Sequence, residues 1–117
     1  MSTRSNRKIT IATRGDLDSD QTFSAAENTS APGQYELKTL ASGANTITVP
    51  TGGSTPTGVT IIPPSGNTTA ITVKGVTGDT GVRIHDTDPT SLGLDSSVTD
   101  FCLTAGAQIT GVRLVWT

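Results

Sequence analysis

Residues 58–75 read GVTIIPPSGNTTAITVKG, and this stretch carries the clearest structural pattern in the chain. Val59 and Ile61 flank Thr60, and residues 71–74 repeat the alternation as ITVK, which is the period of a β-strand with one buried face. Between the two runs lies PPSGN, in which proline cannot donate a ladder hydrogen bond and glycine and asparagine tolerate positive φ. We therefore expect two β-strands joined by a reversal and paired as a β-hairpin.

Short alternating runs separated by turn residues continue through the rest of the chain. They predict strands at 34–40, 45–49, 57–62, 69–74, 81–85, 91–94, 98–104 and 108–116. In the last run, Val112, Leu114 and Trp116 share one face. No segment has the period of an amphipathic helix. The sequence thus predicts a single small all-β domain at 34–117, a β-sandwich with jelly-roll topology, with a barrel as the alternative.

The first 33 residues differ from the rest and are interpreted as an extended arm and loop. Half of the basic residues lie here, and an acidic cluster follows them. One alternating run at 8–12 places Ile9 and Ile11 on one face, so it is suited to add as a strand to this domain or to a neighbour. The basic residues of the arm are Arg4, Arg7, Lys8 and Arg14.

The acidic cluster has the spacing of a calcium-binding loop. Asp16, Asp18, Asp20 and Glu27 occupy positions 1, 3, 5 and 12 of such a loop. Gln21, however, stands where the loop requires glycine, and neither flank has a helical pattern. An acidic, solvated loop is therefore the preferred interpretation, with calcium binding as the alternative, and we expect no cofactor.

No motif predicts catalysis, so we expect a protein that is not an enzyme. His85, Asp86 and Asp88 are close enough in sequence to form a metal or acid–base site, but a single histidine followed by Pro89 is more typical of a loop closed by hydrogen bonds. The single cysteine, Cys102, cannot form an internal disulfide and is expected to be a packed side chain.

Aromatic residues make up only 3% of the chain. Trp116, Tyr35 and Phe101 are the candidates for a carbohydrate-stacking platform. The alternation of Trp116 with Leu114 and Val112 favours a place in the core instead. Such a small core also predicts that partners contribute to stability, and we expect a homo-oligomer or a protein that docks on a larger one.

Charge and hydropathy narrow the class of partner and compartment. A net charge of −2 gives no general reason to expect nucleic-acid binding. No apolar leader and no apolar run of membrane length is present, so synthesis in a cytoplasm and no membrane partner are expected.

The run GVTIIPPSGNTTAITVKGVTGDTGVRIH at 58–85 and the run TAGAQITGVRLVW at 104–116 resemble small β-sandwich virion proteins of tailed bacteriophages. In turn spacing, short length and low aromatic content they are most like a capsid decoration (cement) protein. The resemblance implies a β-rich body, with a trimer favoured, on the exterior of the virion capsid after synthesis in the host cytoplasm. It also implies an extended arm that binds the major capsid protein.

In that interpretation the arm binds through its basic residues and its short strand. The expected contact residues are Arg4, Arg7, Lys8, Ile9, Ile11 and Arg14, which suit an acidic shell surface and strand addition. Two alternatives are a phage tail or fibre domain that binds host-surface carbohydrate, and a metal-dependent or glycan-binding module of a cellular enzyme.

Overall fold

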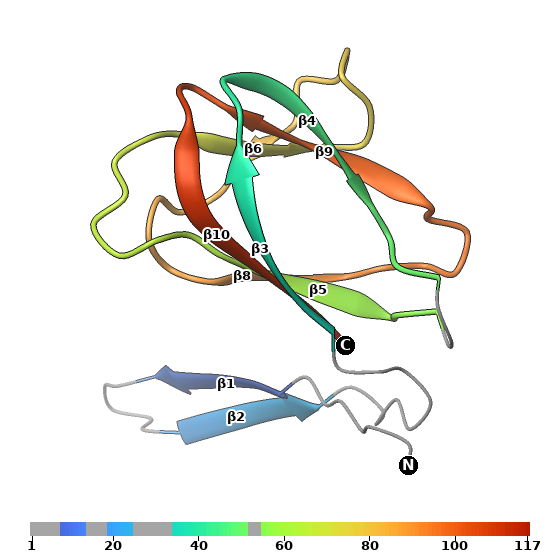
Figure 1. The fold of residues 1–117 in the computed structure, drawn as a ribbon. Coiled ribbons are helices and arrows are strands. Elements are labelled where there is room, and N and C mark those ends of the chain that lie inside the picture. Colours follow the sequence, from blue (N-terminus) through green and yellow to red (C-terminus); the bar gives the residue numbers. More distant parts are fainter. Residues whose placement is uncertain (1–7, 14–18, 25–33, 52–54) are drawn as a thin grey trace.

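The computed structural model describes the backbone of residues 8–13, 19–24, 34–51 and 55–117, and the side chains from Tyr35 onward within these ranges. Two four-stranded antiparallel sheets face each other and form a sandwich (Figure 1). The first sheet contains, in spatial order, β3 (Gln34–Leu40), β10 (Ile109–Trp116), β5 (Gly58–Ile62) and β8 (Thr90–Gly93). The second contains β4 (Gly43–Thr48), β9 (Asp100–Ala105), β6 (Ile71–Lys74) and β7 (Val82–Arg83). No helix occurs in the described ranges.

The strand pairs are nested along the chain. Along the sequence, the first and last strands of the sandwich, β3 and β10, pair with each other, and between them β4 pairs with β9, β5 with β8 and β6 with β7. The pairs β10–β5 and β9–β6 then join these into two sheets. This nested arrangement of eight antiparallel strands in two sheets is the jelly-roll topology, which confirms the predicted fold class.

All eight strands expected in the body are present, most of them with bounds shifted by a residue or two. The predicted hairpin at 58–75 is wrong, however. β5 pairs with β10 and β8, whereas β6 pairs with β9 and β7, so the two strands belong to different sheets. The chain does reverse between them, but β6 crosses to the opposite sheet. The prediction was wrong because alternation and turn residues indicate where strands lie and do not specify which strand pairs with which.

The connection from β5 to β6 contains a tight turn at the predicted place. Asn67 N donates to Pro64 O at 3.1 Å, and Gly66 at the third position of this turn has φ 75°. A positive φ there is the requirement of a type II turn, which only glycine meets without strain. No other type of residue has positive φ in the described part of the chain, so Asn67 contributes through its side chain instead.

The core fills the space between the inner faces of the two sheets. Trp116, Leu114 and Val112 of β10 are fully buried, as predicted from their alternation. Phe101 of β9 lies across from Trp116 with ring centroids 6.2 Å apart and planes tilted by 59°. The core consists of Leu40, Ile47, Val49, Val59, Ile61, Ile71, Ile84, Phe101, Leu103, Ala105, Ile109, Val112, Leu114 and Trp116.

A β-bulge in β10 brings one further residue into this core. Strict alternation back from Val112 would turn Ile109 outward, yet Ile109 is only 4% exposed. The register with β3 shifts between Thr110 and Val112, and Gly111 is the extra residue, with φ 91°. The bulge therefore changes the phase of the alternation so that both Ile109 and Val112 point inward.

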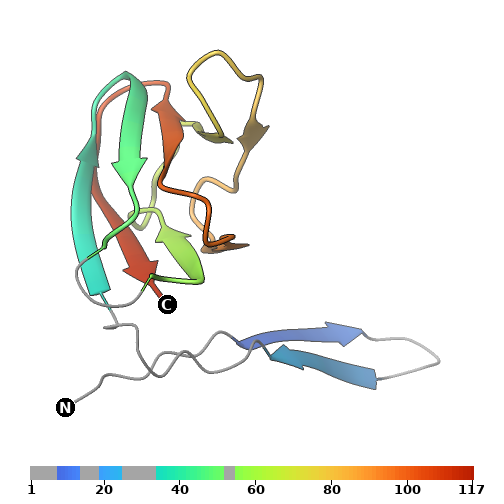
Figure 2. The same ribbon diagram turned by 90° about the vertical axis from the view of Figure 1, so that its right-hand side faces the viewer.

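A separate two-stranded sheet lies in the N-terminal segment. β1 (Lys8–Thr13) pairs antiparallel with β2 (Ser19–Ser24), and the sheet order contains no other strand. Figure 2 shows this hairpin beside the sandwich and outside both of its sheets. The expected strand at 8–12 is thus present, whereas β2 was not anticipated in a segment interpreted as loop.

We predict that Gly111→Ala lowers the free energy of unfolding by about 1 to 2 kcal/mol, because an L-residue is strained at positive φ. The strain is the expected cause, since an added Cβ would lie 3.9 Å from Pro64 Cβ, an ordinary contact. Urea denaturation followed by Trp116 fluorescence measures the change.

The matched control is Gly106→Ala, where φ is not positive and the nearest atom to an added Cβ is Thr69 Cγ2 at 3.8 Å. This variant should be as stable as the wild type or slightly more stable. Equal effects at the two glycines would contradict the role assigned to the bulge.

Candidate functional site

The outward face of the first sheet carries exposed apolar side chains. On β3, Tyr35 is 58% and Leu37 is 66% exposed. In the sheet register Tyr35 lies opposite Val115 and Leu37 opposite Arg113, while Arg113 also lies opposite Ile62 of β5. Directly opposite residues project from the same face of a sheet. The outer strip, defined as Tyr35, Leu37, Ile62, Arg113 and Val115, is therefore a continuous, mainly apolar surface.

The polarity of β3 is inverted relative to the strands beside it. Glu36 lies opposite Leu114, which is fully buried, so Glu36 and Lys38 project toward the core side and are half-buried. Charged residues on the inner side of an edge strand and apolar residues on its outer side are the reverse of a stable monomeric sheet. Since exposed apolar side chains gathered on one face are typical of binding surfaces, the outer face of the first sheet is the candidate interaction surface.

A cleft of about 680 Å³ adjoins the outer strip. Its walls combine aliphatic and proline side chains with the hydroxyl groups of Ser65 and Thr87. Arg113 is the one charged side chain of this lining, and it makes no ion pair or hydrogen bond with any residue in the described part of the chain. A guanidinium beside aliphatic, proline and hydroxyl side chains suits an acidic group carried on a segment that is partly apolar. The lining includes Leu37, Ile62, Pro63, Pro64, Gly111 and Arg113.

A second apolar surface lies at the opposite border of the sandwich, near β7 and β8. Val82 is 70% exposed there, and a cleft of about 480 Å³ reaches the side chains that flank the core. Val73, Leu92, Leu94 and Val98 are partly buried against the core and line this cleft. Because β7 has two residues and β8 has four, the two short edge strands leave this side of the core thinly covered.

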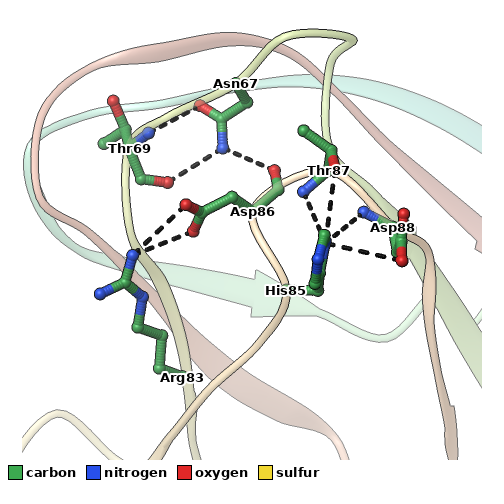
Figure 3. A network of polar contacts seen from close by, with 7 residues as sticks. All are labelled: Asn67, Thr69, Arg83, His85, Asp86, Thr87 and Asp88. Atoms are coloured by element: carbon green, nitrogen blue, oxygen red, sulfur yellow. Dashed lines mark hydrogen bonds and ion pairs between the residues drawn. The ribbon is translucent and has the colours of Figure 1, made fainter.

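The residues predicted as an alternative acid–base or metal site form a loop-closing network (Figure 3). His85 Nδ1 accepts the backbone N–H of Thr87 at 3.1 Å and that of Asp88 at 2.9 Å. A neutral ring that accepts at Nδ1 carries its proton on Nε2. In that form the ring is uncharged and makes no ion pair with Asp88, whose Oδ2 lies 3.8 Å from Nδ1. The Asp86 carboxylate accepts from Arg83 Nη2 at 3.1 Å.

Asn67 ties two loops together beside this network. Its Nδ2 donates to Asp86 O at 2.8 Å and to Thr69 O at 2.9 Å, and its Oδ1 accepts from Thr69 N at 3.2 Å. The connection from β5 to β6 is thereby held against the connection from β7 to β8 (Figure 3). Sequence reasoning assigned Asn67 to the turn but did not anticipate this contact across the molecule.

The Asp95 carboxylate closes the loop between β8 and β9. Ser97 Oγ donates to Asp95 Oδ2 at 2.6 Å and Ser97 N at 3.0 Å, and these two bonds hold the pKa of Asp95 below its ordinary value. Because the pKa of Asp95 is lowered, its hydrogen bonds with Ser97 contribute their full stabilisation at pH values above the ordinary carboxyl pKa. This stabilisation is lost as the pH falls through the lowered pKa. The group is fully exposed, so its role is confined to this turn.

The carbohydrate platform of Trp116, Tyr35 and Phe101 is not formed. Trp116 is fully buried and Phe101 is 6% exposed, whereas Tyr35 is on the outer face of the first sheet. Core placement of Trp116 is therefore confirmed. Cys102 is a free, buried thiol 3.8 Å from Thr104 Oγ1, as expected of a packed side chain.

The expected arm and calcium residues fall mostly outside the described residues. Lys8, Ile9 and Ile11 lie in β1, and Asp20 lies in β2 opposite Ala12. Both the capsid-binding assignment and the calcium loop remain predictions. Within the described residues no three His, Cys, Asp or Glu side chains are grouped so as to hold a metal ion. The residues outside the description are Arg4, Arg7, Arg14, Asp16, Asp18 and Glu27.

Comparison of the chain with protein-family models, with curated proteins and with solved structures gives no match. In the parts of the chain that the structure describes, no helix is long and apolar enough to cross a membrane.

We predict that Asn67→Ala lowers the free energy of unfolding by about 1 to 3 kcal/mol, because one hydrogen bond between two loops and two within the β5–β6 connection are lost together. Thermal unfolding measures the loss. Ser65→Ala in the same connection, where the side chain is exposed, should stay within about 0.5 kcal/mol of the wild type. If both variants melted with the wild type, Asn67 would have no structural role.

Proposed function

We propose that the protein is a virion structural protein, a decoration (cement) protein that binds the exterior of an assembled phage capsid and stabilises it. The observation that carries this proposal is the hairpin of β1 and β2, which pairs with neither sheet of the sandwich. Isolated two-stranded sheets are marginally stable in water and need a third strand or a packing surface. The hairpin is therefore suited to complete its structure on another protein.

The edges of the hairpin supply the means of binding. Among the described strands, β1 and β2 pair only with each other, so each has an edge whose backbone donors and acceptors pair with no other described strand. Strand addition to a capsid subunit satisfies these groups, and it depends little on particular side chains. The sequence places Lys8 in β1 and further basic residues before it, and these favour approach to an acidic shell.

The body contributes a second contact in this proposal. The outer strip and its cleft combine aliphatic surface with the unpaired Arg113, as described above. An arm and a body that bind neighbouring capsid subunits would link them, and binding only to the closed shell stabilises it by mass action. No reaction is needed, because the stabilisation comes from binding to the assembled state and grows with the ratio of the free protein concentration to its dissociation constant.

We predict that deletion of residues 2–24, which removes both strands of the hairpin, abolishes binding to shells assembled without the protein. The body should keep its cooperative unfolding transition, because the core of the sandwich described above is formed by residues between Leu40 and Trp116. Co-sedimentation with shells and circular dichroism measure the two properties. Unchanged binding of the deleted protein would refute the role of the hairpin.

We predict that Arg113→Glu weakens binding to the same shells about tenfold at low salt, since the charge in the cleft is reversed. The variant should fold normally because Arg113 is exposed. Added salt should reduce the difference between variant and wild type. An affinity equal to that of the wild type at low salt would remove the cleft from the docking surface.

Imaging of labelled protein on phage particles separates this function from its alternatives. Many copies over the capsid are expected. Few copies at a tail tip, together with binding of the purified protein to host cells, would favour the tail or fibre domain that binds host carbohydrate. Absence from particles would favour the module of a cellular enzyme.

A further inference from the structure

The free edge of β3 is the longest exposed strand edge of the sandwich. β3 has seven residues, whereas the other edge strands, β4, β7 and β8, have six, two and four. β3 contains neither proline nor glycine, and among the described strands it pairs only with β10. Figure 2 shows β3 at the edge of the first sheet, next to β10. A free edge of this length is a template for pairing with another strand.

The charges on β3 restrict which strand can pair with it. Glu36 and Lys38 point to the same side, two residues apart, and carry opposite charge. Neither makes an ion pair or a side-chain hydrogen bond with any residue in the described ranges. Inward charges on an edge disfavour pairing with an arbitrary strand, because the charges would be brought against apolar side chains.

A second copy of β3 satisfies both charges at once. We propose that two copies of this chain associate through antiparallel β3–β3 pairing about a two-fold axis at Leu37. In that register Glu36 of each copy lies directly opposite Lys38 of the other, so that two cross-strand ion pairs form. Opposite charges in this position stabilise a sheet, whereas like charges destabilise it.

Neighbouring registers do not have this property. A two-fold axis perpendicular to the sheet leaves each side chain on the same face of the sheet in both copies. Since directly opposite residues must share a face, the axis must pass between one residue and the same residue of the second copy. Centring on Glu36 places the two Glu36 side chains opposite each other, and centring on Lys38 does the same for lysine. The charge pattern therefore selects the register centred on Leu37.

The outer face supports the same register. The two Leu37 side chains, each 66% exposed in the single copy, become direct cross-strand neighbours. Tyr35 lies opposite Thr39 of the second copy and diagonal to its Leu37, within reach of an aromatic side chain. The outer strips of the two copies then form one continuous surface, and the apolar residues at the junction are partly removed from water.

This inference is independent of the proposed capsid function, since it concerns only the chain with itself. It differs from the trimer that the resemblance implied, because pairing of β3 with its own copy is isologous and closes with two copies. The two rivals for the free edge are the hairpin of the same chain and a strand of a different protein.

Charge reversal in the full-length protein tests the pairing. Glu36→Lys alone and Lys38→Glu alone each create two like-charge pairs, and each should weaken dimerisation about tenfold. The double variant Glu36→Lys/Lys38→Glu restores opposite pairs and should dimerise as the wild type does. An equimolar mixture of the two single variants should form a heterodimer, because each supplies the charge that the other lacks. Sedimentation equilibrium over a concentration series measures all four.

Lys74→Glu, on β6 in the other sheet, is the control for net charge and should leave dimerisation unchanged. Thermal unfolding of each variant verifies that its fold is intact. A monomeric wild type up to millimolar concentration, a trimeric mass, or single variants that dimerise as the wild type does would each overturn the proposal. So would a mixture of single variants that associates no better than either alone.

Discussion

The structure depends on the contact between β10 and β9, two of its four central strands. Each has a neighbour on both sides, and their inner faces meet where Phe101 of β9 lies across from the fully buried Trp116 of β10. Burial of one such large side chain contributes about 1.5 to 3 kcal/mol. Trp116 Nε1 has no hydrogen-bond partner among the described residues, and an unpaired buried donor costs about 1 to 3 kcal/mol, so the ring contributes to stability through its apolar area. Together with the other core residues, this contact holds the two sheets face to face, and the surfaces described above lie on these sheets.

Strand positions could be predicted from the sequence because they depend on local alternation and turn residues, but strand partners could not. Gly66 and the adjacent prolines fix where the chain leaves β5, and the alternation of Val112, Leu114 and Trp116 fixes the buried face of β10. The partner of β6 depends on residues 101–105, far along the chain, so the short connection suggested a hairpin where none exists. The bulge at Gly111 was missed for a related reason. The shift in the inward–outward alternation of β10 is recognisable only from the burial of Ile109 in the structure.

The candidate surfaces were harder to predict from the sequence than the fold. Alternation at 34–40 predicts a strand without stating which face is buried, and the usual assumption that apolar residues point inward fails for Tyr35 and Leu37. His85 illustrates the opposite case. A pattern that resembles a reactive site is used to close a loop, because two backbone N–H groups reach its Nδ1 first. In both cases the decisive information is the neighbour of the side chain, which lies elsewhere in the sequence.

The nested pairing has a consequence for the order in which the chain folds. Sequence separation is smallest for Val73 opposite Val82 and increases outward to Tyr35 opposite Val115. Each inner pair, once formed, shortens the loop that the next pair must close, so the entropy of loop closure favours assembly from β6–β7 outward. β3 is then the last strand to join, and until it does, one edge of β10 stays open to the β3 of any chain nearby. At high concentration during refolding, exchange of β3 between copies is therefore the characteristic error of this topology.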